Sequence, residues 1–233
     1  MSADGRYVAF SSSASNLVEN LSPAVEEVYI RDTVGGTTVT ASVDPTGAIP
    51  GNKASSAPQI SANGQFVLFY STANNLMSGG GTGYYWRDLQ AGLTYWIGAS
   101  NAPAMSPDGS NVFYGIGSSL ELWQAQTKSS NTVGTLVGGA GSYAISPDGT
   151  RGAFSSGATI YTANLVQHTT AKLGSYQNTT WSQFNFSGDG RYLVNLVQDS
   201  HHTNQVYLYD FQNATNMLVS EAYGGSGGGQ QQM

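Results

Sequence analysis

The sequence contains no cysteine and few charged residues. Only 9% of its 233 residues are Asp, Glu, Lys or Arg, whereas soluble globular proteins have about 25%. The lack of Cys excludes a disulfide framework, a thiolate metal site and a cysteine nucleophile. It does not determine the compartment, because an oxidising location permits disulfides without requiring them.

Positive charge is especially scarce. The chain has 8 Lys and Arg against 14 Asp and Glu, which gives a formal net charge of −6 and a pI near 4.8. Nucleic-acid binding depends on Lys and Arg that neutralise phosphates. We therefore expect no nucleic-acid partner.

Long apolar runs are missing as well. No segment approaches the roughly 18 consecutive apolar residues of a membrane span, so we expect no membrane insertion. The first residues, Met1 to Gly5, have neither the basic start nor the apolar run of a signal peptide. Hydrophobic residues still make up 39% and aromatic residues 11% of the chain, which is enough for a folded core.

A short motif that is present five times determines the fold prediction. Ser, a small residue, Asp or Asn, and Gly are followed each time by apolar and β-branched residues, at intervals of about 40 to 59 residues. The motif suits a tight turn, because Asp bonds to the local backbone and Gly accepts a positive φ. The predicted turn residues are Asp4, Gly5, Asn63, Gly64, Asp108, Gly109, Asp148, Gly149, Asp189 and Gly190.

Each motif lies in a repeat of four predicted strands, and no segment has a helical apolar period. Four strands per 40–45 residues are typical of a propeller blade. We predict an all-β propeller with five four-stranded blades, or five blades of a larger propeller. The expected blades cover residues 1–43, 44–99, 100–138, 139–175 and 176–220, and residues 224–233 form a Gly/Gln-rich tail or begin a further repeat.

The first predicted blade lacks its innermost strand, since only Met1 precedes the first turn motif. Two explanations remain open: the C-terminal tail supplies this strand and closes the ring, or the chain is a piece of a longer propeller. If the ring closes, we expect a monomer.

The turn motifs resemble those of the TolB-like family of WD-repeat-like propellers. The first two repeats also share a Ser-Ala-Ser-Asn-Leu-Val or Ser-Thr-Ala-Asn-Asn-Leu-Met segment and a strand that ends in Arg-Asp, at residues 13–18, 71–77, 31–32 and 87–88. The resemblance implies the propeller fold and a bacterial setting, extracellular or periplasmic. It does not imply one function, since such propellers serve as binding scaffolds, in periplasmic assemblies and beside enzyme domains.

The long predicted loops gather on one face of such a propeller, opposite the turn motifs. They are residues 11–27, 43–58, 71–83, 174–182 and 198–205. Binding residues are often found on loops held by a rigid frame. Tyr176, Asn178 and Trp181 are candidates to stack on and hydrogen-bond a sugar or peptide, although Trp181 also suits packing beside an inner strand.

Metal binding has little support in the sequence. Asp199, His201 and His202 form one cluster, and oligogalacturonate lyases, which the fold resembles, hold a metal through several His. His168 is predicted on the opposite face, and adjacent His side chains of an extended strand point apart. Oxygen ligands for Ca²⁺ are available around Asp44, from Glu19, Glu26 and Glu27, without an EF-hand pattern. We therefore expect no cofactor, with Ca²⁺ as the alternative.

These observations favour a non-enzymatic binding or scaffold module. It would recognise a protein or glycan through the long-loop face or the central channel, and we predict no catalytic residue. Two alternatives remain: a polysaccharide lyase or glycosidase, which would need paired carboxylates or a converging metal site, and an architectural repeat of a larger surface protein.

Overall fold

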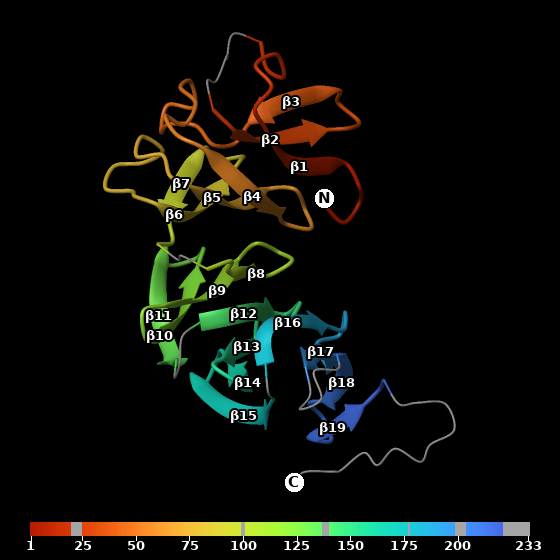
Figure 1. The fold of residues 1–233 in the computed structure, drawn as a ribbon. Helices are drawn as coiled ribbons and strands as arrows, with labels where there is room; N and C mark the ends of the chain where they lie inside the picture. Colours follow the sequence, from red (N-terminus) through yellow and green to blue (C-terminus); the bar gives the residue numbers. More distant parts are fainter. Residues whose placement is uncertain (20–24, 99–100, 137–139, 177, 199–203, 221–233) are drawn as a thin grey trace. The chain divides into compact units, whose positions relative to one another are not determined.

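The protein folds entirely into β-structure (Figure 1). The computed structural model describes residues 1–19, 25–98, 101–136, 140–176, 178–198 and 204–220. These residues form 19 strands and no helix, so the described chain has no helix of the length and apolarity needed to cross a membrane. The all-β prediction is confirmed.

The strands form five sheets in which consecutive strands are neighbours. The first sheet contains β1 (Tyr7–Ser12), β2 (Glu27–Asp32) and β3 (Thr37–Thr40). The second contains β4 (Ser55–Ile60), β5 (Phe66–Ser71), β6 (Gly83–Asp88) and β7 (Leu93–Trp96). The third contains β8 (Ala104–Met105), β9 (Asn111–Ile116), β10 (Ser119–Gln124) and β11 (Ser129–Thr135).

The last two sheets have the same order. The fourth contains β12 (Ala140–Ile145), β13 (Arg151–Ser156), β14 (Thr159–Asn164) and β15 (Thr169–Ser175). The fifth contains β16 (Asn178–Phe186), β17 (Tyr192–Gln198), β18 (Asn204–Asp210) and β19 (Thr215–Leu218). Four sheets thus have four strands, whereas the first has three in the described part of the chain.

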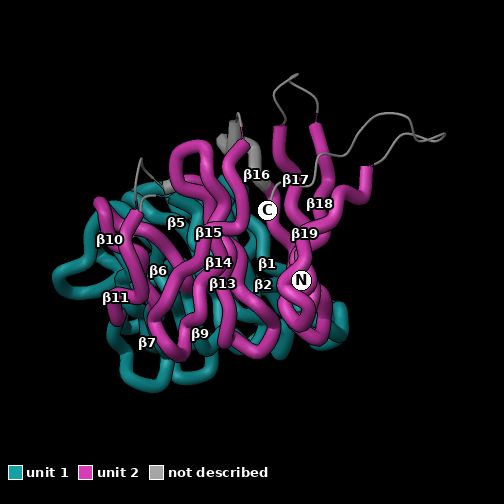
Figure 2. The backbone as a smooth tube through the Cα atoms, turned by 90° about the horizontal axis from the view of Figure 1, so that it is seen from below, with its two compact units in different colours: residues 1–112, 123–130 teal, residues 113–122, 131–233 magenta. Residues whose placement is uncertain are grey.

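The chain divides into two compact units (Figure 2). Unit 1 consists of residues 1–112 and 123–130, and unit 2 of residues 113–122 and 131–233. The division passes through the third sheet, so unit 1 holds the first two sheets complete and unit 2 the last two. Each unit has its own apolar core, and we describe the two separately.

The five turn motifs have the same hydrogen bonds. In the first, the Ser2 hydroxyl donates to Asp4 Oδ1 at 2.6 Å, and the backbone N–H of Arg6 donates to the same oxygen at 3.0 Å. Ser2 Oγ in turn accepts the N–H of Tyr7, the first residue of β1, at 2.8 Å. The other four motifs repeat these contacts, and φ of the five glycines lies at 75°, 73°, 76°, 69° and 68°.

Within unit 1, an aromatic ring of the preceding sheet packs against each of two of these glycines. A Cβ on Gly64 would lie 2.2 Å from Tyr7 Cδ2, and one on Gly109 would lie 2.5 Å from Phe66 Cδ2. The turn therefore needs glycine both for its positive φ and for the space that the ring occupies.

The core of unit 1 lies between its first two sheets. Val28 and Ile30 of β2 pack against Val67 and Phe69 of β5 and against Tyr85 of β6. Side chains alternate along a strand, so this apolar face of β2 leaves Glu27 and Tyr29 on the other face. In unit 2, a corresponding core joins the fourth and fifth sheets through Ala153, Ile160, Phe184, Leu193 and Val197.

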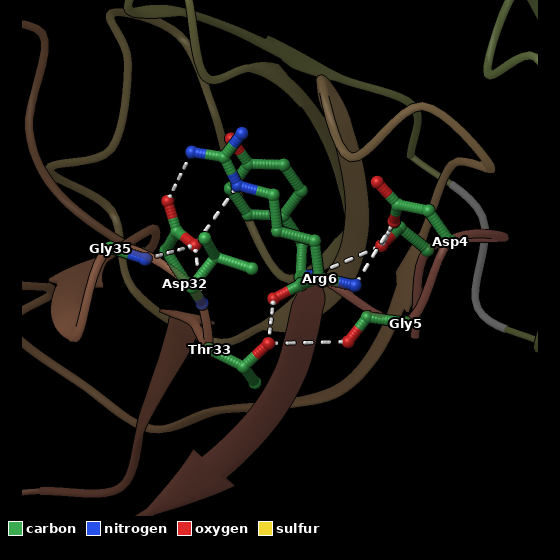
Figure 3. A network of polar contacts seen from close by, with 9 residues as sticks. Asp4, Gly5, Arg6, Asp32, Thr33 and Gly35 are labelled. Atoms are coloured by element: carbon green, nitrogen blue, oxygen red, sulfur yellow. Dashed lines mark hydrogen bonds and ion pairs between the residues drawn. The ribbon is translucent and has the colours of Figure 1, made fainter.

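The turn between the last two strands of each sheet lies beside the Asp-Gly turn. In the first sheet the backbone N–H of Thr33 donates to the carbonyl of Arg6 at 2.8 Å. The Thr33 hydroxyl donates to the same carbonyl at 3.0 Å (Figure 3). The Arg6 guanidinium forms a two-point ion pair with Asp32, with distances of 3.0 and 2.7 Å. The fifth sheet has an equivalent pair, Arg191 with Asp210, at 3.1 and 2.7 Å.

Arg151 does not form the ion pair that its position after a turn motif suggests. Its guanidinium donates to the carbonyl of Gly190 at 3.1 Å and lies over the ring of Phe211. Arg151 stands one residue later in the motif than Arg6, so its side chain projects to the other face of the strand.

For two of the long loops the predicted extent is wrong. Residues 174–182 are almost entirely strand, since β15 ends at Ser175 and β16 begins at Asn178. The β-branched and aromatic residues of this segment, Thr179 to Trp181, favour the extended conformation. The loop expected at 43–58 likewise ends earlier, because β4 begins at Ser55.

Candidate functional site

The two ends of each sheet differ, and we name them by their connections. The turn end carries the Asp-Gly turn and the turn between the last two strands. The loop end carries the connection between the second and third strands of a four-stranded sheet, which in the first sheet is the connection between β1 and β2. It also carries the link to the next sheet. Backbone hydrogen bonds between the two turns fix the turn end in all five sheets.

Long loops occur at the loop end of the first two sheets, in unit 1. The connection between β5 and β6 spans residues 72–82, and the link between β3 and β4 spans residues 41–54. In the third and fourth sheets the equivalent strand connections have two residues each, with glycines at φ 59° and 57°. The long loops of unit 1 are therefore a part of the described chain that departs from the repeat.

Asparagine side chains join these two loops, which lie side by side in Figure 1. Asn52 Nδ2 donates to Asn74 Oδ1 at 2.6 Å, and the N–H of Asn52 donates to Asn75 Oδ1 at 2.9 Å. Asn75 Nδ2 donates to the carbonyl of Pro50 at 2.9 Å. Asn52 and Asn74 are exposed, so this pair of loops presents amide groups to solvent.

The 72–82 loop is anchored to the core of unit 1. Ala73 and Leu76 are fully buried in that core. The Tyr85 hydroxyl donates to the carbonyl of Gly81 at 2.6 Å and also contacts the carbonyl of Ala73 at 3.3 Å. These contacts hold both ends of the loop against β6.

Trp96 adds an aromatic surface to the same end of the second sheet. It is the last residue of β7 and pairs in register with Tyr85. Its backbone N–H donates to Met77 Sδ at 3.0 Å, and its ring lies against Gly81. The side chain remains 41% exposed. An exposed indole beside rigid amide-bearing loops resembles the composition of binding surfaces that combine Trp with adaptable polar residues.

Tyr176, Asn178 and Trp181, the binding candidates predicted from sequence, belong to unit 2, in and after the link between the fourth and fifth sheets. Tyr176 is half-buried in the core of unit 2, where its ring lies 5.6 Å from that of Tyr207. Its hydroxyl accepts a weak hydrogen bond from Asn216 at 3.4 Å, and burial raises its pKa. Asn178 and Trp181 are residues of β16 and do not lie in a loop.

Of the His and Asp residues considered as metal ligands, the structure describes only part. Asp199, His201 and His202 lie outside the described residues. His168 lies in the turn after β14, at the turn end of its sheet. Among the described residues no three His, Cys, Asp or Glu side chains gather in a geometry for a metal ion.

The Ca²⁺ candidates have separate roles. Asp44 closes its own loop, accepting the N–H of Ile49 at 3.0 Å and the Thr46 hydroxyl at 2.8 Å, and these bonds lower its pKa despite burial. Glu26 accepts the Ser11 hydroxyl at 2.7 Å. Glu19 is exposed, whereas Glu27 is completely buried, which raises its pKa to about 7.

Comparison with known proteins identifies the fold. No protein-family model matches the chain, and no curated protein matches it in sequence. Solved structures do match: TolB from Acinetobacter baumannii has 16% sequence identity and a TM-score of 0.54 over 94% of this chain. An oligogalacturonate lyase in complex with manganese has 12% identity and a TM-score of 0.62 over 93% of this chain. The sheets are blades of a TolB-like β-propeller fold.

At these identities the likeness concerns the fold alone. The chain spans 53% of the TolB structure and 62% of the lyase. A third match, dipeptidyl peptidase 4 from Porphyromonas gingivalis, has 12% identity and a TM-score of 0.61, and the chain spans 38% of it. The same blade arrangement thus occurs in proteins as different as a lyase and a peptidase, so function must be argued from this chain's own residues.

Sequence reasoning did not identify Trp96 or the Asn52–Asn74 contact. Trp96 fits the alternation of a strand, and only its place at the end of a four-residue outer strand, opposite the Gly-rich segment 79–81, indicates exposure.

Proposed function

We propose that the chain is a non-enzymatic binding or scaffold module that recognises a protein or glycan through the loop end of its first two sheets. The observation that supports this proposal best is the exposed Trp96 against the anchored 72–82 loop. A rigid frame lowers the entropy that a loop loses on binding. The amides of Asn52 and Asn74 supply donors and acceptors for hydroxyl or peptide groups.

The proposal includes an extracellular or periplasmic setting. It is supported by the resemblance of the turn motifs to TolB-like propellers and by the shared fold with TolB. The low content of charged residues and the absence of cysteine are compatible with it.

The experiment uses the intact chain on a glycan array and a peptide library, followed by titration calorimetry with the strongest hit. Trp96→Ala is expected to weaken binding by about 2 kcal/mol, roughly 30-fold, the loss usual for a central Trp of an interface. Leu93→Ala is the matched control, because Leu93 lies on the same strand, is 50% exposed and stands at the turn end.

Retained affinity in Leu93→Ala together with loss in Trp96→Ala supports the site. If both variants bind with the affinity of the unsubstituted chain, binding occurs elsewhere. If neither the glycan array nor the peptide library gives a hit, the proposed function is contradicted.

A further inference from the structure

The Glu27 carboxyl is fully buried at the start of β2, beneath the segment 43–51 of the link between the first two sheets. This segment, which we call the cap loop, is closed by a Val43–Pro50 bridge and by the N–H of Gly51, which donates to the carbonyl of Ser42 at 2.9 Å. A Cβ on Gly51 would lie 3.1 Å from each Glu27 carboxyl oxygen. The cap loop thus lies directly against the carboxyl.

Only one oxygen of this carboxyl has a hydrogen bond within the described chain. The Ser42 hydroxyl donates to Oε2, while Oε1 has no partner among the described residues. The Ser55 hydroxyl is near enough to lower the pKa of Glu27, but the hydrogen bond it forms, at 2.9 Å, is to Ser71 Oγ. A buried carboxylate needs several donors to offset its lost hydration, and Glu27 lacks them.

No cation of the described chain compensates for a charge on Glu27. Its pKa is affected by burial and by the Ser42 and Ser55 hydroxyls, and by no charged neighbour. The titratable and charged groups of the surrounding elements are Glu26 just before β2, Tyr29, Arg31 and Asp32 on β2, Asp44 in the cap loop, Lys53 after it, and Arg87 on β6. Arg31 donates to the Thr38 hydroxyl, Asp32 pairs with Arg6, and Arg87 interacts with Asp44 and Asp88. On β1 the register partner is the uncharged Ser12.

We propose that Glu27 is a proton-dependent latch for the cap loop: the neutral carboxyl keeps the loop closed, and ionisation favours an open loop in which water reaches the carboxylate. The sheets themselves do not have to unfold for this, because in the described chain the backbone hydrogen bonds of residues 43–51 join residues 42–51 to one another and not to a strand. The inference goes beyond the proposed function, since it concerns the loop with or without a ligand.

The direction of the effect follows from linkage. Burial raises the pKa of Glu27 from 4.5 to about 7 in the closed state. Between these values the closed state holds one proton more than the open state, so closure is strongest below about pH 4.5 and weakens as pH rises to about 7. Well above pH 7 the carboxyl is ionised in both states, so the equilibrium between the closed and the open loop no longer depends on pH.

Hydrogen exchange of the backbone amides in residues 43–51 measures the latch. In the unsubstituted chain, protection corrected for the intrinsic rate is expected to fall roughly 30-fold between pH 5.5 and 8.0. Glu27→Gln keeps the shape and an acceptor for Ser42 without a titrating proton, so its protection should not change with pH. Glu26→Gln, which removes the adjacent carboxylate, should behave like the unsubstituted chain.

A second measurement needs no substitution. Infrared spectra of the unsubstituted chain should show a protonated-carboxyl C=O band that disappears with a midpoint near pH 7. The proposal is overturned if no carboxyl titrates between pH 6 and 8, or if folded Glu27→Gln retains the pH dependence of the cap loop.

Discussion

Gly109 shows what a single residue contributes to the repeat. Its φ is 76°, and Phe66 of the preceding sheet occupies the position that a side chain would need. Gly92, in the neighbouring turn of unit 1, has a similar φ of 70°, but no atom lies within 4 Å of the position that a Cβ would take there. The two positions therefore separate backbone strain from steric overlap.

Gly109→Ala is expected to lower the free energy of unfolding by about 2–5 kcal/mol, the sum of about 1–2 for a left-handed backbone and about 1–3 for overpacking. Gly92→Ala should lower the free energy of unfolding only by the backbone contribution, about 1–2 kcal/mol. Denaturant unfolding of both variants checks the difference. Equal losses would mean that Phe66 moves aside freely and that the close approach is unimportant.

The turn residues could be predicted from sequence because their chemistry is local. The Ser hydroxyl, the side-chain oxygen of Asp or Asn, and the backbone of each motif bond within six residues of one another. The burial of Glu27 could not be predicted, since it depends on a cap loop that folds back over β2. In the sequence, Glu27 follows Glu26 and resembles a solvated acidic pair.

Among the elements, the 72–82 loop depends on the strand beneath it. Tyr85 of β6 holds the loop through the carbonyls of Gly81 and Ala73. The loop is long, but its apolar residues belong to the core of unit 1. We therefore treat it as part of the rigid frame.

Tyr85→Phe is expected to cost about 1–2 kcal/mol of stability, because it leaves the Gly81 carbonyl without its donor. Amide exchange in residues 72–82 should rise, while exchange in the core strand β5 stays unchanged. Tyr161→Phe, at a tyrosine of unit 2 whose ring stacks on Phe154, is the control. The anchor is unimportant if both variants leave the exchange of residues 72–82 unaltered.

Most strands could be predicted from alternating apolar and β-branched residues. The prediction for the segment 174–182 is wrong, since Gly174 and the polar Gln177 and Asn178 resemble a loop. The pairing of β16 with β17 decides its conformation, and such long-range pairing is not visible in a local pattern. The exposure of Trp96 also depends on contacts between distant segments, and the sequence pattern does not reveal it.

Across the molecule, repetition determines the fold and departures from repetition indicate function. The turn end has the same hydrogen bonds in every sheet, whereas the loop end of the first two sheets has long loops with Trp96 and two exposed asparagines. The matches to TolB, a lyase and a peptidase show that this fold accompanies different activities. The fold was predictable from the five motifs, but the proposed binding surface required the structure.

Binding through the loop end is best tested by hydrogen exchange of the intact chain with and without the strongest glycan or peptide hit. We predict increased protection in residues 41–54 and 72–82 and at Trp96, with no change in the turns at residues 61–64 and 89–92. Protection confined to the turn end, or to unit 2, would contradict the account.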